Sequence, residues 1–445
     1  MTQAPTLMIA APASGSGKTI LTLSLLRHFR NQGSVISSFK AGPDFIDPAF
    51  HLAASGRKCL NLDCWAMNPA TLARLAAAAG EGADLVIGEG VMGLFDGATD
   101  GTGSTADLAA LAGWPVVLVV DVRGQGTSAA ATVSGFARFR ADVRLVGVIF
   151  NRVGGEGHAR ILRDAMAPLG IPVLGCVPRD PRLHLPDRHL GLVQAGELDD
   201  LDAFLDAAAA VVGAHVDTDA LGALARPGTA PGGDGAAAGI PPLGQRIAVA
   251  RDTAFAFAYP FVLDGWRGAG AEIVPFSALA DEAPDGAADA VYLPGGYPEL
   301  HAGRLAGNAA FLDGLRATAA RGGVIYGECG GYMVLGEGLV DGDERRHEMA
   351  GLVALETSFA RRRLHLGYRQ ARLVSDGPLG AGGTEYRGHE FHYATILREP
   401  AAEPLFQCRD ARDDDLGPAG CRRGNVMGSF VHLVDAAFNG VPRQR

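Results

Sequence analysis

The 445-residue sequence contains no apolar run as long as the roughly 18 residues that a membrane-spanning helix needs. The residues from Met1 to Ala10 lack the basic start and the cleavage site of a signal peptide. Basic residues are also outnumbered: 39 Lys and Arg stand against 49 Asp and Glu, which gives a formal net charge of -10. Nucleic-acid affinity comes largely from clustered Lys and Arg. We therefore expect a cytoplasmic protein whose partners include neither a membrane nor a nucleic acid.

Paired cysteines are missing as well. None of the six cysteines belongs to a Cys-x-x-Cys pair, so the sequence indicates neither a zinc knuckle nor a disulfide framework. A hydrophobic content of 48% and a charged content of 20% predict a globular protein, and the length favours two or three domains. These features together favour chemistry on small molecules.

One cysteine stands in a setting that separates it from the other five. Cys329 lies in Gly-Glu-Cys-Gly-Gly, directly after the apolar run 323–326. This pattern is typical of a nucleophile elbow, in which a strand delivers the side chain to a tight turn and glycines admit a substrate carbonyl. A buried structural thiol is the alternative, because most lone cysteines only pack.

A cysteine nucleophile needs a base and an oxyanion site. The best candidate for the base is His432, which lies beyond a glycine turn and a strand-like apolar run. The rival histidines are His365, His389 and His392. Two glycines follow the predicted strand 290–293, where the N–H of Gly296 could complete an oxyanion hole with that of Gly330.

The N-terminal part contains a P-loop in its usual context. The predicted strand 6–10 runs into Ala-Pro-Ala-Ser-Gly-Ser-Gly-Lys-Thr, and a helical pattern follows over 20–29. In such loops backbone N–H groups wrap a phosphate chain, the lysine reaches the terminal phosphates and the threonine hydroxyl ligates magnesium. Pro12 replaces the usual first glycine, so the bend must be made differently. The residues expected to bind ATP here are Gly15, Ser16, Gly17, Lys18 and Thr19.

Further apolar strands follow at intervals that leave room for helices, which predicts an α/β fold with a wound parallel sheet. These strands are expected over 35–39, 84–88, 116–120, 145–150 and 173–177. Ligands of wound sheets bind beyond the carboxyl ends of the strands. The polar residues at those ends are Lys40, Asp44, Glu89, Asp121 and Asn151. Of these, Lys40 and Asn151 are expected to contact the nucleotide.

Two acids near these ends are candidates for magnesium or for catalysis. Glu89, just after an apolar run, is the natural acidic partner of Thr19 at a metal ion, although an acid at a strand end can equally cap a helix. Asp44 and Asp47 lie in a loop between two prolines and could place a carboxylate near the transferring phosphate. Ordinary Asp-Pro turn chemistry is the alternative.

The chain divides at residues 221–245, which lose periodicity and fill with Gly, Ala and Pro, as linkers do. A second α/β set follows, with strands expected over 246–250, 272–274, 290–293 and 323–326. We therefore predict a P-loop domain over 1–220, a linker over 221–245 and a domain containing Cys329 over 246–445.

Over nearly its whole length the sequence resembles the cobyrinic acid a,c-diamide synthases, called hydrogenobyrinic acid a,c-diamide synthases in the aerobic route to vitamin B12. The resemblance rests on the variant P-loop and on the motifs over 40–48, 89–97, 151–153, 293–299, 327–336 and 388–393. It implies a dethiobiotin synthetase-like domain followed by a class I glutamine amidotransferase domain. This type lacks the usual acid two residues after the histidine, where Val434 stands. Asp435 and Glu390 are the acids considered for orienting His432.

The resemblance implies ATP-dependent amidation of the a and c acetate side chains of a corrin, with L-glutamine as nitrogen source and Mg²⁺ as cofactor. Phosphorylation would turn a poor acyl donor into an acyl phosphate that ammonia can attack. Cys329 would attack the glutamine amide, and His432 would activate the thiol and protonate the leaving ammonia. Asp44 and Glu89 would act at the metal or position the substrate.

Several alternatives stay open. The chain could be a cobyric acid synthase or a nickel-sirohydrochlorin a,c-diamide synthase. More distantly, it could be a scaffold ATPase with an inactive amidotransferase part, although Ala13 stands where that class has a second lysine. The arginines of 361–363, with Arg369 and Arg387, either meet the corrin polycarboxylate or form a solvated charge run. A homodimer also remains an option.

Overall fold

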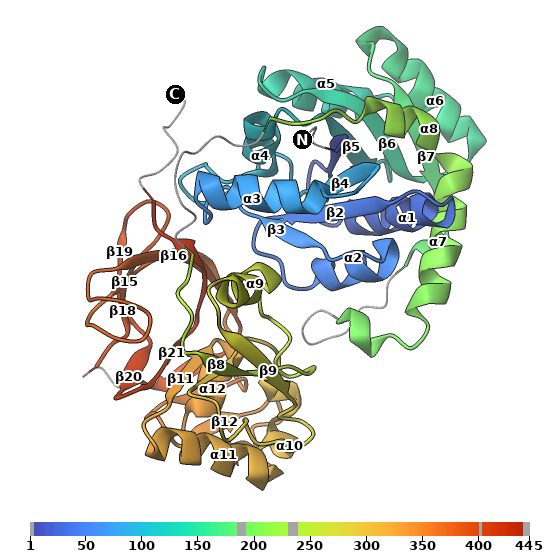
Figure 1. The fold of residues 1–445 in the computed structure, drawn as a ribbon. Coiled ribbons are helices and arrows are strands. Elements are labelled where there is room, and N and C mark those ends of the chain that lie inside the picture. The colour runs from blue at the N-terminus through green and yellow to red at the C-terminus, as the bar shows by residue number, and fades with distance from the viewer. Residues whose placement is uncertain (1–3, 185–192, 230–238, 400–402, 439–445) are drawn as a thin grey trace. The chain divides into compact units, whose positions relative to one another are not determined.

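The computed structural model describes residues 4–184, 193–229, 239–399 and 403–438. The chain divides into two compact units (Figure 1). The first comprises residues 1–65 and 69–236, and the second comprises residues 66–68 and 237–445. Among the described helices, none combines the length and the hydropathy that crossing a membrane requires.

The first unit contains a seven-stranded parallel sheet in the order β3-β2-β4-β1-β5-β6-β7. Its strands are β1 (Thr6–Ala10), β2 (Ile36–Ala41), β3 (Leu60–Leu62), β4 (Leu85–Glu89), β5 (Val116–Asp121), β6 (Leu145–Val153) and β7 (Val173–Pro178). Its α-helices are α1 (Lys18–Asn31), α2 (Asp47–Ser55), α3 (Pro69–Gly80), α4 (Thr105–Ala112), α5 (Ser128–Phe139), α6 (Glu156–Met166), α7 (Leu201–His215) and α8 (Thr218–Leu224). The wound parallel sheet predicted from sequence is confirmed.

Strands of this sheet read as continuous apolar runs because parallel sheets are covered on both faces. All residues of β1 are buried, and Leu7 and Ile9 share one core cluster with residues of α1 and α7. The predicted strands therefore match the structure closely. The three-residue strand β3 was not predicted, because it is too short to show a pattern.

The expected linker is partly folded. Helix α8 extends into residues 221–245, and Leu221 is fully buried in the core of the first unit. The backbone of Arg226 pairs with that of Thr6 in an isolated antiparallel bridge. The Gly- and Ala-rich composition of this segment therefore did not indicate that part of it packs against the first unit. The boundary between the units falls at residues 236 and 237. Residues 230–238 of the predicted linker lie outside the described part of the chain.

The second unit is built around a six-stranded sheet in the order β20-β21-β11-β10-β8-β9, in which only β20 runs antiparallel to its neighbour. Its strands are β8 (Arg246–Ala250), β9 (Glu272–Phe276), β10 (Ala290–Leu293), β11 (Val324–Glu328), β20 (Cys421–Arg423) and β21 (Val426–Ser429). The helices of this unit are α9 (Pro260–Gly268), α10 (Ala302–Gly307), α11 (Ala309–Ala320) and α12 (Gly330–Leu335). The α/β class predicted for this unit is confirmed.

Two further sheets of the second unit were not predicted. One has the order β13-β12-β14-β17, and the other is antiparallel with the order β19-β18-β15-β16-β22. Their strands are β12 (Gly338–Val340), β13 (Arg346–Glu348), β14 (Glu356–Ser358), β15 (His365–Leu373), β16 (Glu385–His392), β17 (Thr395–Arg398), β18 (Phe406–Arg409), β19 (Asp415–Ala419) and β22 (Val431–Ala436). Many of these strands are short or polar, so they lack a clear hydrophobic signal. Strands β16 and β22 carry His389 and His432.

Candidate active sites

The P-loop connects β1 to α1. Gly15 and Gly17 have φ angles of 78° and 86°, in the left-handed region that favours glycine. Lys18 is the first residue of α1, so the free N–H groups at the start of this helix border the loop. The side chain of Asn151 donates a hydrogen bond of 2.9 Å to the carbonyl of Ser16. Asn151, predicted as a nucleotide contact, therefore holds the loop itself.

A hydrogen bond fixes the backbone directly before the variant position Pro12. The carbonyl of Ala11 accepts a hydrogen bond of 2.8 Å from the N–H of Leu94. A cavity of about 580 Å³ is lined mainly by the P-loop and by residues at and after the end of β5, among them Asp121 and Arg123. The cavity thus lies at the carboxyl ends of β1 and β5, where wound parallel sheets bind ligands.

Glu89 is the centre of a buried charge cluster at the end of β4. Its side chain is fully buried, and its Oε1 atom lies 2.8 Å from Nζ of Lys40 and 3.2 Å from Nζ of Lys18. The hydroxyl of Thr19 donates to the same oxygen at 2.6 Å. Burial alone would raise the pKa of Glu89, but Lys40 and Lys18, together with His51, hold it well below its usual range. An ionised Glu89 therefore gathers both lysines and Thr19.

Asp47, the first residue of α2, lies closer to this cluster than Asp44 does. Nζ of Lys40 is 2.5 Å from Oδ2 of Asp47 and 4.0 Å from Oδ2 of Asp44. The other oxygen of Asp44 accepts hydrogen bonds from the N–H groups of Ile46 and Asp47. Burial, and then the charge of Asp44, raise the pKa of Asp47 to about 6 despite Lys40. Asp44 therefore shapes the loop, whereas Asp47 points its carboxylate at the lysine.

His51 is the residue of this cluster that sequence reasoning missed. Its Nε2 lies 2.7 Å from Oε2 of Glu89, and its ring is fully buried. Helix α2 contains both Asp47 and His51, and their spacing of four residues places them on one helix face. The four-residue spacing of Asp47 and His51 could have indicated that both face the site. The sequence analysis considered polar residues directly after predicted strands, and His51 does not follow one.

Cys329 occupies a strained turn between β11 and α12. Its φ and ψ angles are 47° and -102°, which is costly for a residue other than glycine and is found in nucleophile elbows. Its N–H donates a hydrogen bond of 2.8 Å to the carbonyl of Ser429. The residue is buried, and Sγ lies 4.0 Å from the carbonyl oxygen of Phe391. The turn predicted from sequence is present.

The environment of Cys329 keeps its thiol protonated. Burial, followed by the charge of Glu299, raises the pKa of the Cys329 thiol above its usual range, and the N–H of Gly330 acts in the opposite direction. The thiolate is the nucleophilic form of cysteine. This thiol therefore needs a base that takes its proton when it attacks a substrate.

Two glycines after β10 bring the predicted oxyanion site and the predicted base together. A Cβ atom added to Gly295 would overlap the imidazole of His432, at 3.1 Å from Nε2 and closer still to Cε1. A Cβ atom added to Gly330 would lie 3.0 Å from the backbone nitrogen of Gly296. Close approach therefore requires glycine at both positions. The turn that contains Gly295 and Gly296 lies between the elbow and His432.

The acid that the structure brings to His432 is Glu328, the residue before the nucleophile. Its Oε2 atom lies 3.7 Å from Nδ1 of His432. Three donors fix this buried carboxylate: the hydroxyl of Tyr292 at 2.7 Å, the hydroxyl of Tyr326 at 2.9 Å and the N–H of Leu433 at 3.2 Å. A fixed carboxylate at this distance can orient the imidazole of His432 through its negative charge.

Asp435 and Glu390, the acids considered from sequence, have other partners. Asp435 accepts hydrogen bonds from two backbone N–H groups, one of them that of Asn68 at 3.0 Å. Glu390 forms an ion pair with Arg369 at 2.7 Å. In the described part of the chain the structure therefore favours Glu328 beside the predicted base. The acids considered from sequence, Asp435 and Glu390, lie near His432 or in a separate histidine-rich motif, and the acid next to the cysteine was not considered for this role.

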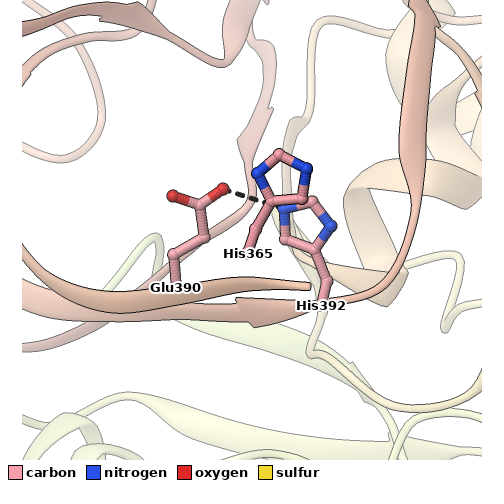
Figure 2. A group of neighbouring side chains, drawn as sticks. All are labelled: His365, Glu390 and His392. Atoms are coloured by element: carbon pink, nitrogen blue, oxygen red, sulfur yellow. Dashed lines mark hydrogen bonds and ion pairs between the residues drawn. The ribbon is translucent and has the colours of Figure 1, made fainter. Parts of the chain in front are cut away.

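The rival histidines lie in the same unit. His389 stacks on His432 with ring centroids 5.0 Å apart, and its Nε2 is 2.8 Å from the hydroxyl of Tyr259. Burial, and then the charge of His432, lower the pKa of His389 well below its usual value. His365 and His392 stack on each other (Figure 2). His432 remains the candidate base, and the neutral ring of His389 packs against its imidazole.

The fold and the two sites define an amidotransferase that carries its own nucleotide-binding unit. A family model described as a CobB/CobQ-like glutamine amidotransferase domain matches residues 246–439. A second, described as a CobQ/CobB/MinD/ParA nucleotide binding domain, matches residues 7–193.

Curated relatives extend this match to nearly the whole chain. The hydrogenobyrinate a,c-diamide synthase of Brucella suis is 57% identical over 96% of this chain and 98% of its own length. The enzyme of Rhizobium meliloti is 57% identical over 96% of this chain and 99% of its own length. The enzyme of Rhodobacter capsulatus is 55% identical over 96% of this chain and 98% of its own length. The chain belongs to the hydrogenobyrinate a,c-diamide synthase family.

Proposed function

We propose that this chain catalyses ATP- and glutamine-dependent amidation of the a and c carboxylates of hydrogenobyrinic acid in cobalamin biosynthesis. The observation that carries this proposal is that one chain holds two clusters of reactive side chains, one in each unit. Lysines and acids surround Glu89 beside a P-loop, and Glu328, the residue before the strained Cys329, lies 3.7 Å from His432. The first cluster suits activation of a carboxylate, and the second suits release of ammonia from glutamine.

Activation of the carboxylate is assigned to the first unit. The P-loop N–H groups and Lys18 would hold the phosphates of ATP. An oxygen of the corrin carboxylate attacks the γ-phosphorus and the bond to ADP breaks, which yields an acyl phosphate. Lys18 and Lys40 stabilise the charge on the transferring group. Ammonia then attacks the carbonyl carbon, and phosphate leaves as the amide forms.

The oxygen donors of the first unit fit Mg²⁺, which prefers oxygen ligands. The hydroxyl of Thr19 lies 2.6 Å from Oε1 of Glu89 and 3.4 Å from Oδ2 of Asp47. We assign these three residues to the ion, with Asp44 in the adjoining loop, where it lies 4.0 Å from Lys40. When bound, the ion supplies positive charge for the phosphates.

Release of ammonia from glutamine is assigned to the second unit. His432 takes the proton of Cys329, and Sγ attacks the side-chain carbonyl carbon of glutamine, while the N–H groups of Gly296 and Gly330 stabilise the oxyanion. The C–N bond breaks, and His432 gives its proton to the leaving ammonia. Water then hydrolyses the thioester and releases glutamate.

We predict that Glu328→Gln lowers kcat for glutamine hydrolysis about 10²-fold, at the lower end of what general acid–base catalysis contributes, with little change in KM. The substitution removes the negative charge beside Nδ1 of His432, so the imidazole is held less well for the two proton transfers. The measurement is kcat and KM for glutamine hydrolysis.

The matched control for this prediction is Glu399→Gln. Glu399 is a partly buried acid that also accepts a hydrogen bond from a tyrosine hydroxyl, that of Tyr332 at 2.8 Å, but it belongs to a different hydrogen-bond pair. Its glutaminase kcat should stay near the wild-type value. A wild-type kcat in Glu328→Gln would show that Glu328 does not act through His432.

We also predict that Gly295→Ala lowers glutaminase activity about 10²-fold, because the added methyl group displaces His432 and small misplacements of catalytic groups have effects of this size. Amidation with ammonium salts should stay near the wild-type rate. Gly265→Ala in α9 is the control, since its new methyl group has open space. Equal losses with glutamine and ammonium would indicate general misfolding instead.

The decisive test of the proposed function is mass spectrometry of hydrogenobyrinic acid after incubation with this protein, ATP, Mg²⁺ and glutamine. We expect a gain of two amides, with NMR placing them on the a and c side chains. Cobyrinic acid and nickel-sirohydrochlorin serve as parallel substrates. Amidation of other carboxylates, or preference for one of the parallel substrates, would contradict the assignment.

A further inference from the structure

The pairing of β15 with β16 gathers two histidines and a glutamate on one side of a sheet. His365 and His392 are directly opposite each other in the antiparallel register, and Glu390 is opposite Gly367. Side chains two residues apart on a strand point to the same face. The register therefore places His365, Glu390 and His392 on a common face at one end of the strand pair.

The three side chains converge, as Figure 2 shows. The rings of His365 and His392 are parallel within 5°, and their centroids are 4.6 Å apart. Nε2 of His392 lies 2.8 Å from Oε1 of Glu390. One potential ligand atom from each residue lies within 4.8 Å of the other two.

Neighbouring residues fix this cluster in place. Arg369 binds Oε2 of Glu390 at 2.7 Å, so the carboxylate is oriented while Oε1 remains on the side of the histidines. The ring of Phe430 stacks on His392 at 4.0 Å. His392 is 5% exposed, and its Nδ1 has no hydrogen-bond partner in the described part of the chain. Outer contacts that orient ligands in this way are a common feature of metal sites.

We propose that His365, Glu390 and His392 form a binding site for a divalent transition-metal ion of the zinc class. Two imidazoles and one carboxylate are the donor set of many zinc and non-haem iron sites, and this set differs from the oxygen ligands that magnesium prefers. Zinc–ligand bonds of about 2.0–2.2 Å require the donor atoms to close to about 3.3 Å from one another. Because the two imidazole planes are parallel, the ring of His365 must also rotate out of the stack to direct its in-plane lone pair at the same ion.

The site would reinforce the segment next to the nucleophile. Phe391 lies between two of the proposed ligands, and its carbonyl oxygen is 4.0 Å from Sγ of Cys329. An ion that ties the start of β15 to the end of β16 would fix this segment. The inference concerns only residues of the second unit and does not depend on which carboxylate the enzyme amidates.

The test is equilibrium dialysis of the full-length, chelator-treated protein against Zn²⁺, with Co²⁺ absorption as a second probe. A Cys329→Ser background removes the nearby thiol as a competing ligand. We expect one tightly bound ion per chain in the wild type and in Cys329→Ser. In the same background His365→Ala should weaken binding at least about tenfold, as is typical when a metal site loses a supporting group.

Two controls separate binding at this cluster from binding elsewhere on the chain and from misfolding. His347→Ala removes a histidine that pairs with Asp341 at 2.7 Å, outside the cluster, and should bind Zn²⁺ as the wild type does. Circular dichroism without metal tests folding, and Glu390→Gln provides a second ligand variant. Absence of a bound ion in the wild type, its loss in Cys329→Ser, or unchanged affinity in both folded ligand variants would overturn the proposal.

Discussion

Replacing Cys329 by serine should abolish glutamine-dependent amidation and leave ammonia-dependent amidation near the wild-type rate. The serine oxygen has nearly the shape of the thiol but is a much weaker nucleophile, and loss of a nucleophile removes about 10⁴-fold or more of the rate. The elbow geometry should survive, because the strained backbone is held by the hydrogen bond from the N–H of residue 329 to Ser429. The measurement is corrin amidation with glutamine and with ammonium chloride in parallel.

Cys408→Ala is the matched control, because Cys408 is a second buried cysteine of the same unit, on β18. It should keep both activities. If Cys329→Ser retained glutamine-dependent turnover, Cys329 would be a structural thiol and the elbow assignment would be wrong. If it lost both activities, the two reactions could not be assigned to separate sites. A scaffold ATPase with an inactive amidotransferase part would show neither activity in the wild type.

Lys18→Ala should have the complementary effect. Amidation should fall about 10³-fold with either nitrogen source, because preorganised positive charge on a transferring phosphoryl group contributes on this scale. Glutamine hydrolysis should continue, since Cys329 and His432 belong to the other unit. The measurements are corrin amidation with each nitrogen source and release of glutamate.

Lysine is scarce in this chain, which makes the control simple. The sequence contains Lys18, Lys40 and Lys58 alone, and Lys58 is exposed. Lys58→Ala should therefore amidate at the wild-type rate. If Lys18→Ala amidated the corrin at the wild-type rate, the P-loop would not be the site that activates the carboxylate. Lys40 is less suitable as a first test, because its loss removes the ammonium group from Asp47 and one of the two lysines that pair with buried Glu89, and breaking a buried ion pair costs about 3–5 kcal/mol.

Local patterns were enough to predict the parallel sheet of the first unit, most parallel strands of the central sheet of the second unit, and the two central turns. The P-loop needs small residues, a lysine and a threonine in a fixed order between a strand and a helix. The cysteine turn likewise needs glycines around Cys329, because neighbouring backbone approaches closely. Such requirements act over a few residues, so a single sequence displays them. The antiparallel sheet that carries His432 shows no such pattern, because its strands are short or polar.

The sequence by itself therefore determined the class of chemistry: a phosphate-binding loop and a cysteine elbow on two α/β units. Only the tertiary structure decided which groups surround them. It placed Asp47 at Lys40, in a position considered for Asp44, and Glu328 beside His432. The physical reason is that these contacts depend on how the chain folds between the partners: Asp47 and Lys40 belong to a helix and a strand joined by a loop, and Glu328 and His432 lie on strands far apart in the chain. The partner of a carboxylate can be identified only when burial and strand register bring the two groups together.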